Sequence, residues 1–263
     1  MKELRKLTEE QKTLSYAKYF YRPMAPIPAE KLALLDKGPM DPAVALHIEN
    51  REELQKPGHF ECENGYWMME NGTGIVATHV TMPGATIAMA QWWFAWHALE
   101  DTRYKIWDPE DHFYARNLNK DRALDHSLPM MDRIAGCTHE VYEDIGLGPA
   151  KIWIEFKKPS ALGYDESKLG SDKGAIIICA MCRAEGMAII FTHFFREIED
   201  GIELKSRYWI GYALVDHGVV NVLPEGVAVP ADALKGLFVH SIKEYSNLSA
   251  LLPKIYPEEK DNW

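Results

Sequence analysis

Residues 230–252, PADALKGLFVHSIKEYSNLSALL, decide the fold. Pro230 is well placed to open a helix, and Pro253 follows the stretch, so we expect a long helix that ends near Leu251. Most of the residues at helical spacing are apolar, and they define one face: Leu234, Leu237, Phe238, Ser241, Ile242, Tyr245, Leu248 and Leu252. A helix with one apolar face must be covered by another part of the chain.

The preceding half of the chain predicts that cover as a set of short strands. Turn signals recur every 10–15 residues between apolar runs, which cover residues 151–156, 174–184, 188–197, 203–215 and 218–223. Residues 60–82 also favour strands, around the turn ENGTG at 70–74, and the Trp-rich stretch 85–100 favours a buried helix. A strand meander before a long helix predicts an α+β fold, with a curved antiparallel sheet that grips the helix around a cavity.

The first 58 residues differ from the rest. They are mixed in polarity and carry several prolines, which favours short helices and loops. We therefore expect an N-terminal extension over residues 1–58, packed on a core domain over residues 59–263.

Composition limits the partners of this protein. The 263 residues are 47% hydrophobic and 26% charged, with a formal net charge of −10, which disfavours nucleic-acid phosphates. The longest apolar stretch, 85–99, contains Gln91 and His97 and is too short for a membrane span. Because the first residues lack the apolar run of a signal peptide, we expect a cytoplasmic protein.

Cys179 and Cys182 form a CxxC pattern that could mark a metal or redox site. The pattern lies within the apolar run AIIICAMC at 175–182, where the two side chains of a strand would face opposite sides. We therefore interpret both cysteines as core residues.

His240 and Glu244 are four residues apart on the predicted helix, so both side chains can reach one ion. Leu237 and Ser241 share their face, which directs the pair toward the sheet. The same spacing is common by chance, and a solvated ion pair is the alternative. Further donors are His112, expected at a loop in DPEDH at 108–112, and Glu143, which could equally be one surface acid among several.

Three motifs resemble the 2,4-diacetylphloroglucinol hydrolase family, which includes phloretin hydrolase. They are WWFAWHALE at 92–100, RYKIWDPEDH at 103–112 and the HxxxE pair at 240–244. The resemblance covers roughly residues 60–252 and implies a Bet v 1-like helix-grip fold. It also implies a Zn²⁺ ion, whose ligands, matched by motif and order, would be His112, Glu143, His240 and Glu244.

The resemblance further implies a hydrolase that cleaves the C–C bond between an acyl group and a phloroglucinol-type ring, as a retro-Claisen reaction. Phloretin or another acylphloroglucinol would be the substrate, and a homodimer would fit the family. The implied catalytic residues are Tyr104, His193 and Tyr208. Tyr104 and Tyr208 would also contact the substrate, and Asn117 would do so in place of a family Asn whose position Ala115 occupies.

Two other classes of function remain open. A helix-grip cavity can carry a hydrophobic ligand without chemistry, and histidine–carboxylate sets also serve Fe(II) oxygenases or cyclases. His97, on the Trp-rich helix, is expected to be a satisfied core histidine. We assign no role to the other histidines.

Overall fold

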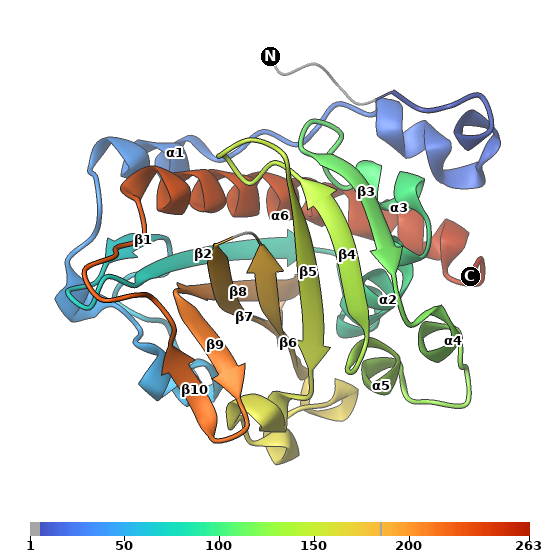
Figure 1. Cartoon of the computed structure of the whole chain (residues 1–263). Coiled ribbons are helices and arrows are strands. Elements are labelled where there is room, and N and C mark those ends of the chain that lie inside the picture. Colours follow the sequence, from blue (N-terminus) through green and yellow to red (C-terminus); the bar gives the residue numbers. More distant parts are fainter. Residues whose placement is uncertain (1–5, 185) are drawn as a thin grey trace.

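The computed structural model describes residues 6–184 and 186–263. Eight antiparallel strands form one curved sheet in the order β1-β2-β8-β7-β6-β5-β4-β3, and the long helix α6, Ala231–Glu259, lies across it (Figure 1). Helix α6 packs most extensively against β2 and also contacts β1 and α2. The expected α+β helix-grip arrangement is confirmed.

The strands of the large sheet are β1 Gly65–Met68, β2 Gly74–Pro83, β3 His112–Asn117, β4 Thr138–Glu143, β5 Ala150–Lys157, β6 Ala175–Ala184, β7 Met187–Ile198 and β8 Gly201–Ile210. A separate hairpin pairs β9, Tyr212–Val215, with β10, Gly218–Asn221. The prediction of one continuous strand over residues 203–215 is therefore wrong, because β8 and β9 are two separate strands. Gly211 divides it with a φ of 94°, a left-handed conformation that favours glycine.

Sequence patterns missed β3 and β4, and the loop expected at His112 is wrong, because His112 is the first residue of β3. In β4 the buried positions alternate as a strand requires, but two of the three side chains are His139 and Glu143. A rule that searches for alternating apolar residues does not detect a strand whose buried face is mostly polar.

The helices are α1 Ala29–Asp36, α2 Ile87–Trp96, α3 Asp101–Lys105, α4 Lys120–Ala123, α5 Met130–Ile134 and α6, with short 3-10 turns between them. The helix expected over 85–100 ends as a 3-10 turn at His97–Leu99, and Glu100 then caps α3.

The expected end of the last helix near Leu251 is also wrong, because α6 continues through Pro253 and Pro257. An interior proline removes a backbone hydrogen bond and costs about 3 kcal/mol. Packing in this last part offsets that cost, since Ile255 is fully buried and the Tyr256 ring lies 5.3 Å from the ring of Trp92.

The two faces of the sheet carry separate apolar clusters. One lies between the sheet and α6 and contains Cys182, and the other, on the opposite face, contains Cys179. The two thiols are free and point to opposite faces, so the interpretation of both as core residues is confirmed. Ile48 and Leu54 fill the second cluster.

The N-terminal segment also packs on the last helix. Ser15 Oγ and Tyr19 Oη donate hydrogen bonds of 2.9 Å to Glu259 and Glu258, and Arg22 donates one of 2.6 Å to Asn247 Oδ1. The division into an extension over residues 1–58 and a core over residues 59–263 stays a prediction. Among the described residues, no helix is long and apolar enough to cross a membrane.

Candidate active site

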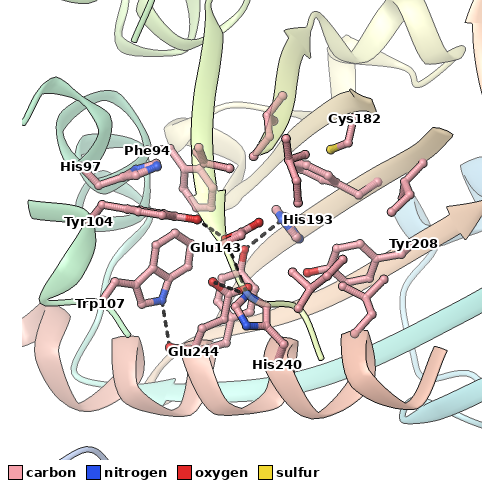
Figure 2. A pocket seen from close by; sticks show the side chains of 18 of the residues that line it. Phe94, His97, Tyr104, Trp107, Glu143, Cys182, His193, Tyr208, His240 and Glu244 are labelled. Carbon is pink, nitrogen blue, oxygen red and sulfur yellow. Dashed lines mark hydrogen bonds and ion pairs between the residues drawn. The ribbon is translucent and has the colours of Figure 1, made fainter. Parts of the chain in front are cut away.

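A cavity lies between the sheet and α6, with about 660 Å³ of space free of atoms, its mouth included (Figure 2). Aromatic and aliphatic side chains form most of its wall, and the polar residues among them come from α3, β4, β7, β8 and α6. Those polar residues are Tyr104, Glu143, His193, Tyr208, His240, Glu244 and Tyr245, and His97 joins them from the 3-10 turn after α2.

The four expected metal ligands come together at one end of this cavity, with His112 just behind the wall. His112 opens β3 and Glu143 closes β4, and the two are direct partners in the antiparallel ladder. His240 and Glu244 lie one helical turn apart on α6 and face them. All four side chains are at least nine-tenths buried.

The donor atoms of these residues lie at distances that suit a small cation. Nε2 of His112 is 3.4 Å from Oε2 of Glu143 and 3.7 Å from Oε2 of Glu244. Nε2 of His240 is 3.8 Å from the Glu143 oxygen and 3.9 Å from the Glu244 oxygen. A tetrahedron with bonds of about 2.1 Å has edges of roughly 3.4 Å, so a modest contraction would complete such a site.

Neighbouring groups hold His112 in one tautomer. Its Nδ1 donates a 3.1 Å hydrogen bond to the backbone oxygen of Tyr104, which leaves a lone pair on Nε2. The Tyr104 ring is stacked on the imidazole at 3.8 Å, and its hydroxyl donates a hydrogen bond to Glu143. Such contacts orient a metal-binding histidine and raise its basicity.

The protonation behaviour of the cluster also fits a cation. Burial raises the pKa values of Glu143 and Glu244, and burial with the charge of His240 lowers that of His112. Nε2 of His112 is buried and has no hydrogen-bond partner among the described residues. A divalent ion would give this nitrogen a partner and would favour the charged carboxylates.

A second group of acids lies on the outer side of His240. Lys243 contacts Asp108 at 3.1 Å and Glu110 at 3.3 Å, and it donates a hydrogen bond to Asp111. Asp111 Oδ2 lies 3.5 Å from Nδ1 of His240. Donor atoms of Asp108, His112 and His240 also lie within 4.8 Å of one another. The single charge of Lys243 is shared among three carboxylates, and Asp108 and Asp111 form a layer behind His240.

Two hydroxyl networks line the rest of the cavity. Tyr208 Oη lies 3.1 Å from Ser241 Oγ, and His193 is hydrogen-bonded to Ser206 Oγ and to Tyr245 Oη, both at 2.9 Å. Burial raises the pKa values of both tyrosines and lowers that of His193 to about 3. The phenols therefore stay protonated and the imidazole stays neutral near pH 7.

Comparison with known proteins adds to this geometry. Residues 46–257 match the sequence model described as the DAPG hydrolase PhiG domain, which is well over half of the chain. The chain belongs to the DAPG hydrolase family. It is 42% identical to the phloretin hydrolase of Eubacterium ramulus, over 97% of this chain and 94% of that protein. It is 30% identical to the 2,4-diacetylphloroglucinol hydrolase of Pseudomonas protegens, over 92% of this chain and 84% of that protein.

The similarity of this DAPG hydrolase family member to solved structures is low. The structure of Ara h 8.0201 aligns with 69% of this chain and 98% of its own, at 8% identity and a TM-score of 0.42. The strand order and the long helix described above define the fold.

The residues expected to contact a substrate are only partly brought together in this family member. Tyr104, His193 and Tyr208 line the cavity, but Asn117 is not among its lining residues. Asn117 is buried at the far end of β3, where its Oδ1 accepts a 2.7 Å hydrogen bond from the backbone of Asn119. Its expected contact with the substrate is therefore not supported by its position, which is that of a turn cap.

Two further cavity residues were not expected. Tyr245 fits the apolar period of α6, so its hydroxyl was not distinguished from the core in sequence. Its position four residues after Ser241 was the signal that could have found it, since residues at this spacing share one face of a helix and Ser241 contacts the cavity residue Tyr208. His97 also lines the cavity, and its hydrogen bond to the helix backbone uses only one of its two ring nitrogens, so the expectation of a satisfied core histidine holds only in part.

Proposed function

We propose that this protein is a zinc-dependent hydrolase that cleaves the C–C bond between an acyl group and a phloroglucinol-type ring. The observation that carries the proposal is the convergence of His112, Glu143, His240 and Glu244 on one end of a cavity with a mostly aromatic and aliphatic wall. The names of the relatives support the substrate class, which is phloretin or another acylphloroglucinol.

The metal has a defined task in this proposal. The two histidines and two glutamates would hold a Zn²⁺ ion, which when bound would supply Lewis acidity and lower the pKa of a water to about 7. The buried, unpartnered Nε2 of His112 and the mixed imidazole–carboxylate donor set support zinc as the ion.

The protein groups around the cavity would act on the aromatic ring. Hydrolysis adds water to the acyl carbon, and the electrons of the broken C–C bond pass to the ring, which must then gain a proton on carbon. Hydroxyls beside the acyl group let the ring take a keto form, so its oxygens carry the charge. Tyr104 and Tyr208 stay protonated, and each could stabilise such an oxygen; Tyr104 would first exchange its hydrogen bond with Glu143 for one with the ring.

The test is anaerobic incubation of the metal-loaded protein with phloretin and with diacetylphloroglucinol, followed by mass spectrometry of the products. We expect the free carboxylic acid and the deacylated ring, and about one divalent metal per chain by elemental analysis. Cleavage that requires O₂ would indicate an oxygenase, and binding without cleavage would indicate a carrier.

A matched substrate tests the retro-Claisen step. The phloretin analogue without the two hydroxyls that flank the acyl chain keeps only the hydroxyl opposite that chain. Its ring takes the keto form far less readily, so we expect no cleavage of it. Comparable cleavage of both compounds would exclude ring tautomerisation, even with zinc in place.

The compartment and the assembly are part of the same proposal. We infer a cytoplasmic enzyme and, by analogy with the family, a homodimer. Size-exclusion chromatography with light scattering would measure the assembly directly.

A further inference from the structure

His97 ends the Trp-rich helix and enters the cavity beside Phe94 and above Tyr104 (Figure 2). Its Nδ1 lies 2.8 Å from the backbone oxygen of Trp93. A carbonyl oxygen only accepts hydrogen bonds, so Nδ1 must carry the proton. Nε2 of the neutral ring is then an acceptor, and it has no hydrogen-bond partner among the described residues.

Burial keeps this imidazole neutral. The side chain is 3% exposed, and burial lowers its pKa to about 4. The ring of His139 lies 5.3 Å away, and burial with the nearby His97 lowers the pKa of His139 as well. Nδ1 of His139 is buried and has no hydrogen-bond partner among the described residues. The cavity wall therefore carries the neutral imidazole of His97, and a second neutral imidazole, that of His139, lies against it.

The surroundings of His97 suit an aromatic group. The centroid of its ring lies 5.9 Å from that of Tyr104 in a stacked arrangement, and the Tyr104 centroid lies 3.8 Å from that of His112. The Tyr104 ring therefore lies between His97 and His112, one of the four expected metal ligands. Phe94 and Trp107 present their edges to it at 5.6 Å and 5.4 Å. A ligand group that reaches His97 lies at the end of the molecule remote from the bond that is cleaved.

We infer that Nε2 of His97 accepts a hydrogen bond from a phenolic hydroxyl of the bound ligand and so determines its specificity. The inference rests on the proposed function, which brings the acyl carbon to the ligand set. In phloretin two hydroxyls could reach this position: the one on the distal ring of the acyl chain, and the ring hydroxyl opposite the acyl group. His97 thereby takes the recognition role for which Asn117 lies in the wrong place.

A double-mutant cycle between the protein and the ligand tests the inference. The ligands are phloretin, its analogue without the distal hydroxyl and its analogue without the hydroxyl opposite the acyl group. The proteins are the full-length, metal-loaded wild type and His97→Phe, which keeps a ring of similar size. Affinity is measured before turnover, by rapid-mixing quenching of tryptophan fluorescence, since Trp107 lines the cavity.

We expect the wild type to bind one analogue roughly 5- to 100-fold more weakly than phloretin, because a buried acceptor then lacks its donor. In His97→Phe that ratio should fall to about one for the same analogue. The analogue that shows the coupling identifies which ring supplies the hydroxyl. His217→Phe, in an exposed turn, is the matched control and should keep the wild-type ratios.

If His97 has a purely structural role, His97→Phe should weaken the binding of all three ligands by the same factor and leave the affinity ratios unchanged. That result would overturn the inference. Equal binding of all three ligands by the wild type would also overturn it, without any variant. If His97→Phe does not fold, His97→Gln keeps an acceptor and should retain part of the discrimination. Binding with these ratios but no cleavage would refute the proposed function alone, whereas cleavage without coupling would refute only the role of His97.

Discussion

Two side-chain hydrogen bonds hold the two halves of the ligand set together. Trp107 Nε1 donates a 2.9 Å hydrogen bond to the backbone oxygen of Glu244, and Asn247 Nδ2 donates one of 2.6 Å to the backbone oxygen of Trp107. These bonds tie the segment before β3 to α6 beside His240 and Glu244. Because the helix is tied at this point, the two pairs of donors face each other without a long or flexible connection.

Replacement of His240 or Glu244 by alanine should remove the metal and abolish cleavage while the fold persists. Alanine is the best helix former, and the apolar face of α6 stays unchanged. Elemental analysis, circular dichroism and product formation measure the three properties. Lys235→Ala, at a more exposed position of the same helix, should keep both metal and activity. A variant without metal that retains wild-type turnover would remove this pair from the site.

Tyr104→Phe and Tyr208→Phe should each lower turnover by roughly 10²–10³, because each loses the hydroxyl that we propose stabilises a ring oxygen during cleavage. Metal content should not change, since the phenylalanine ring can still stack on His112 as Tyr104 does. Steady-state kinetics with phloretin give the effect, and Tyr21→Phe, at an exposed position, is the control. Unchanged turnover in both variants would place the aromatic ring elsewhere.

At the scale of elements, strand pairing and helical period bring the donors together. The β3–β4 ladder sets His112 opposite Glu143 at the edge of the sheet, and one turn of α6 sets His240 beside Glu244. Neither pair can shift by one residue without its side chains turning away from the cavity. Elements that carry such a site must therefore be held firmly in register.

Glu63 joins the segment before β1 to strand β8. It contacts the buried Lys205 at 2.9 Å and the buried Arg207 at 2.7 Å. Burial alone would raise the pKa of Glu63, but the Arg207 charge and the hydrogen bonds lower it to about 2. Because this pKa lies below the ordinary value, the stabilisation is complete above about pH 4.5 and is lost as the pH falls toward 2.

Glu63→Gln should therefore destabilise the protein by about 3 kcal/mol at pH 7, since two buried cations lose their counter-charge. Urea unfolding at several pH values measures the difference from the wild type, which should shrink below pH 4.5. Glu61→Gln, at an exposed acid two residues earlier, should change little. A difference that stays constant down to pH 2.5 would show that the ionised carboxylate is not what matters.

At the scale of the whole molecule, the N-terminal segment covers two separate surfaces. Residues around Tyr16 and Phe20 join the cluster beneath α6, whereas Ile48 and Leu54 fill the cluster on the other face of the sheet. Trp209 Nε1 also donates a 2.9 Å hydrogen bond to the backbone oxygen of Leu46. The segment thus spans the sheet and packs on both of its faces.

Two deletions test the proposed boundary between the extension and the core. Removal of residues 1–28 should cost several kcal/mol, at roughly 1.5–3 kcal/mol for each large apolar side chain lost, and should leave metal binding intact. Removal of residues 1–58 should cost more, because the second cluster loses Ile48 and Leu54. Thermal unfolding and metal content measure both effects. Equal stability of the two shortened chains would show that residues 29–58 contribute nothing.

Sequence alone determined the features that depend on near neighbours. The helical period of residues 234–252 predicted α6, the runs between turns predicted most strands, and the HxxxE spacing placed His240 and Glu244 on one face. The long motifs around residues 92–112 predicted the family. All of these follow from local periodicity or from a contiguous stretch of residues, which a sequence displays directly.

Tertiary structure alone decided the features that depend on distant parts of the chain. The pairing of His112 with Glu143 required strands whose buried residues are polar, and the passage of α6 through Pro253 required packing on α2. It also put Asn117 at the end of β3, where it caps the following turn, and His97 in the cavity. Long-range contacts set the register of the strand ladder and the burial of polar side chains. Their free energy can exceed the local conformational preference, and such contacts produce no periodic pattern in the sequence.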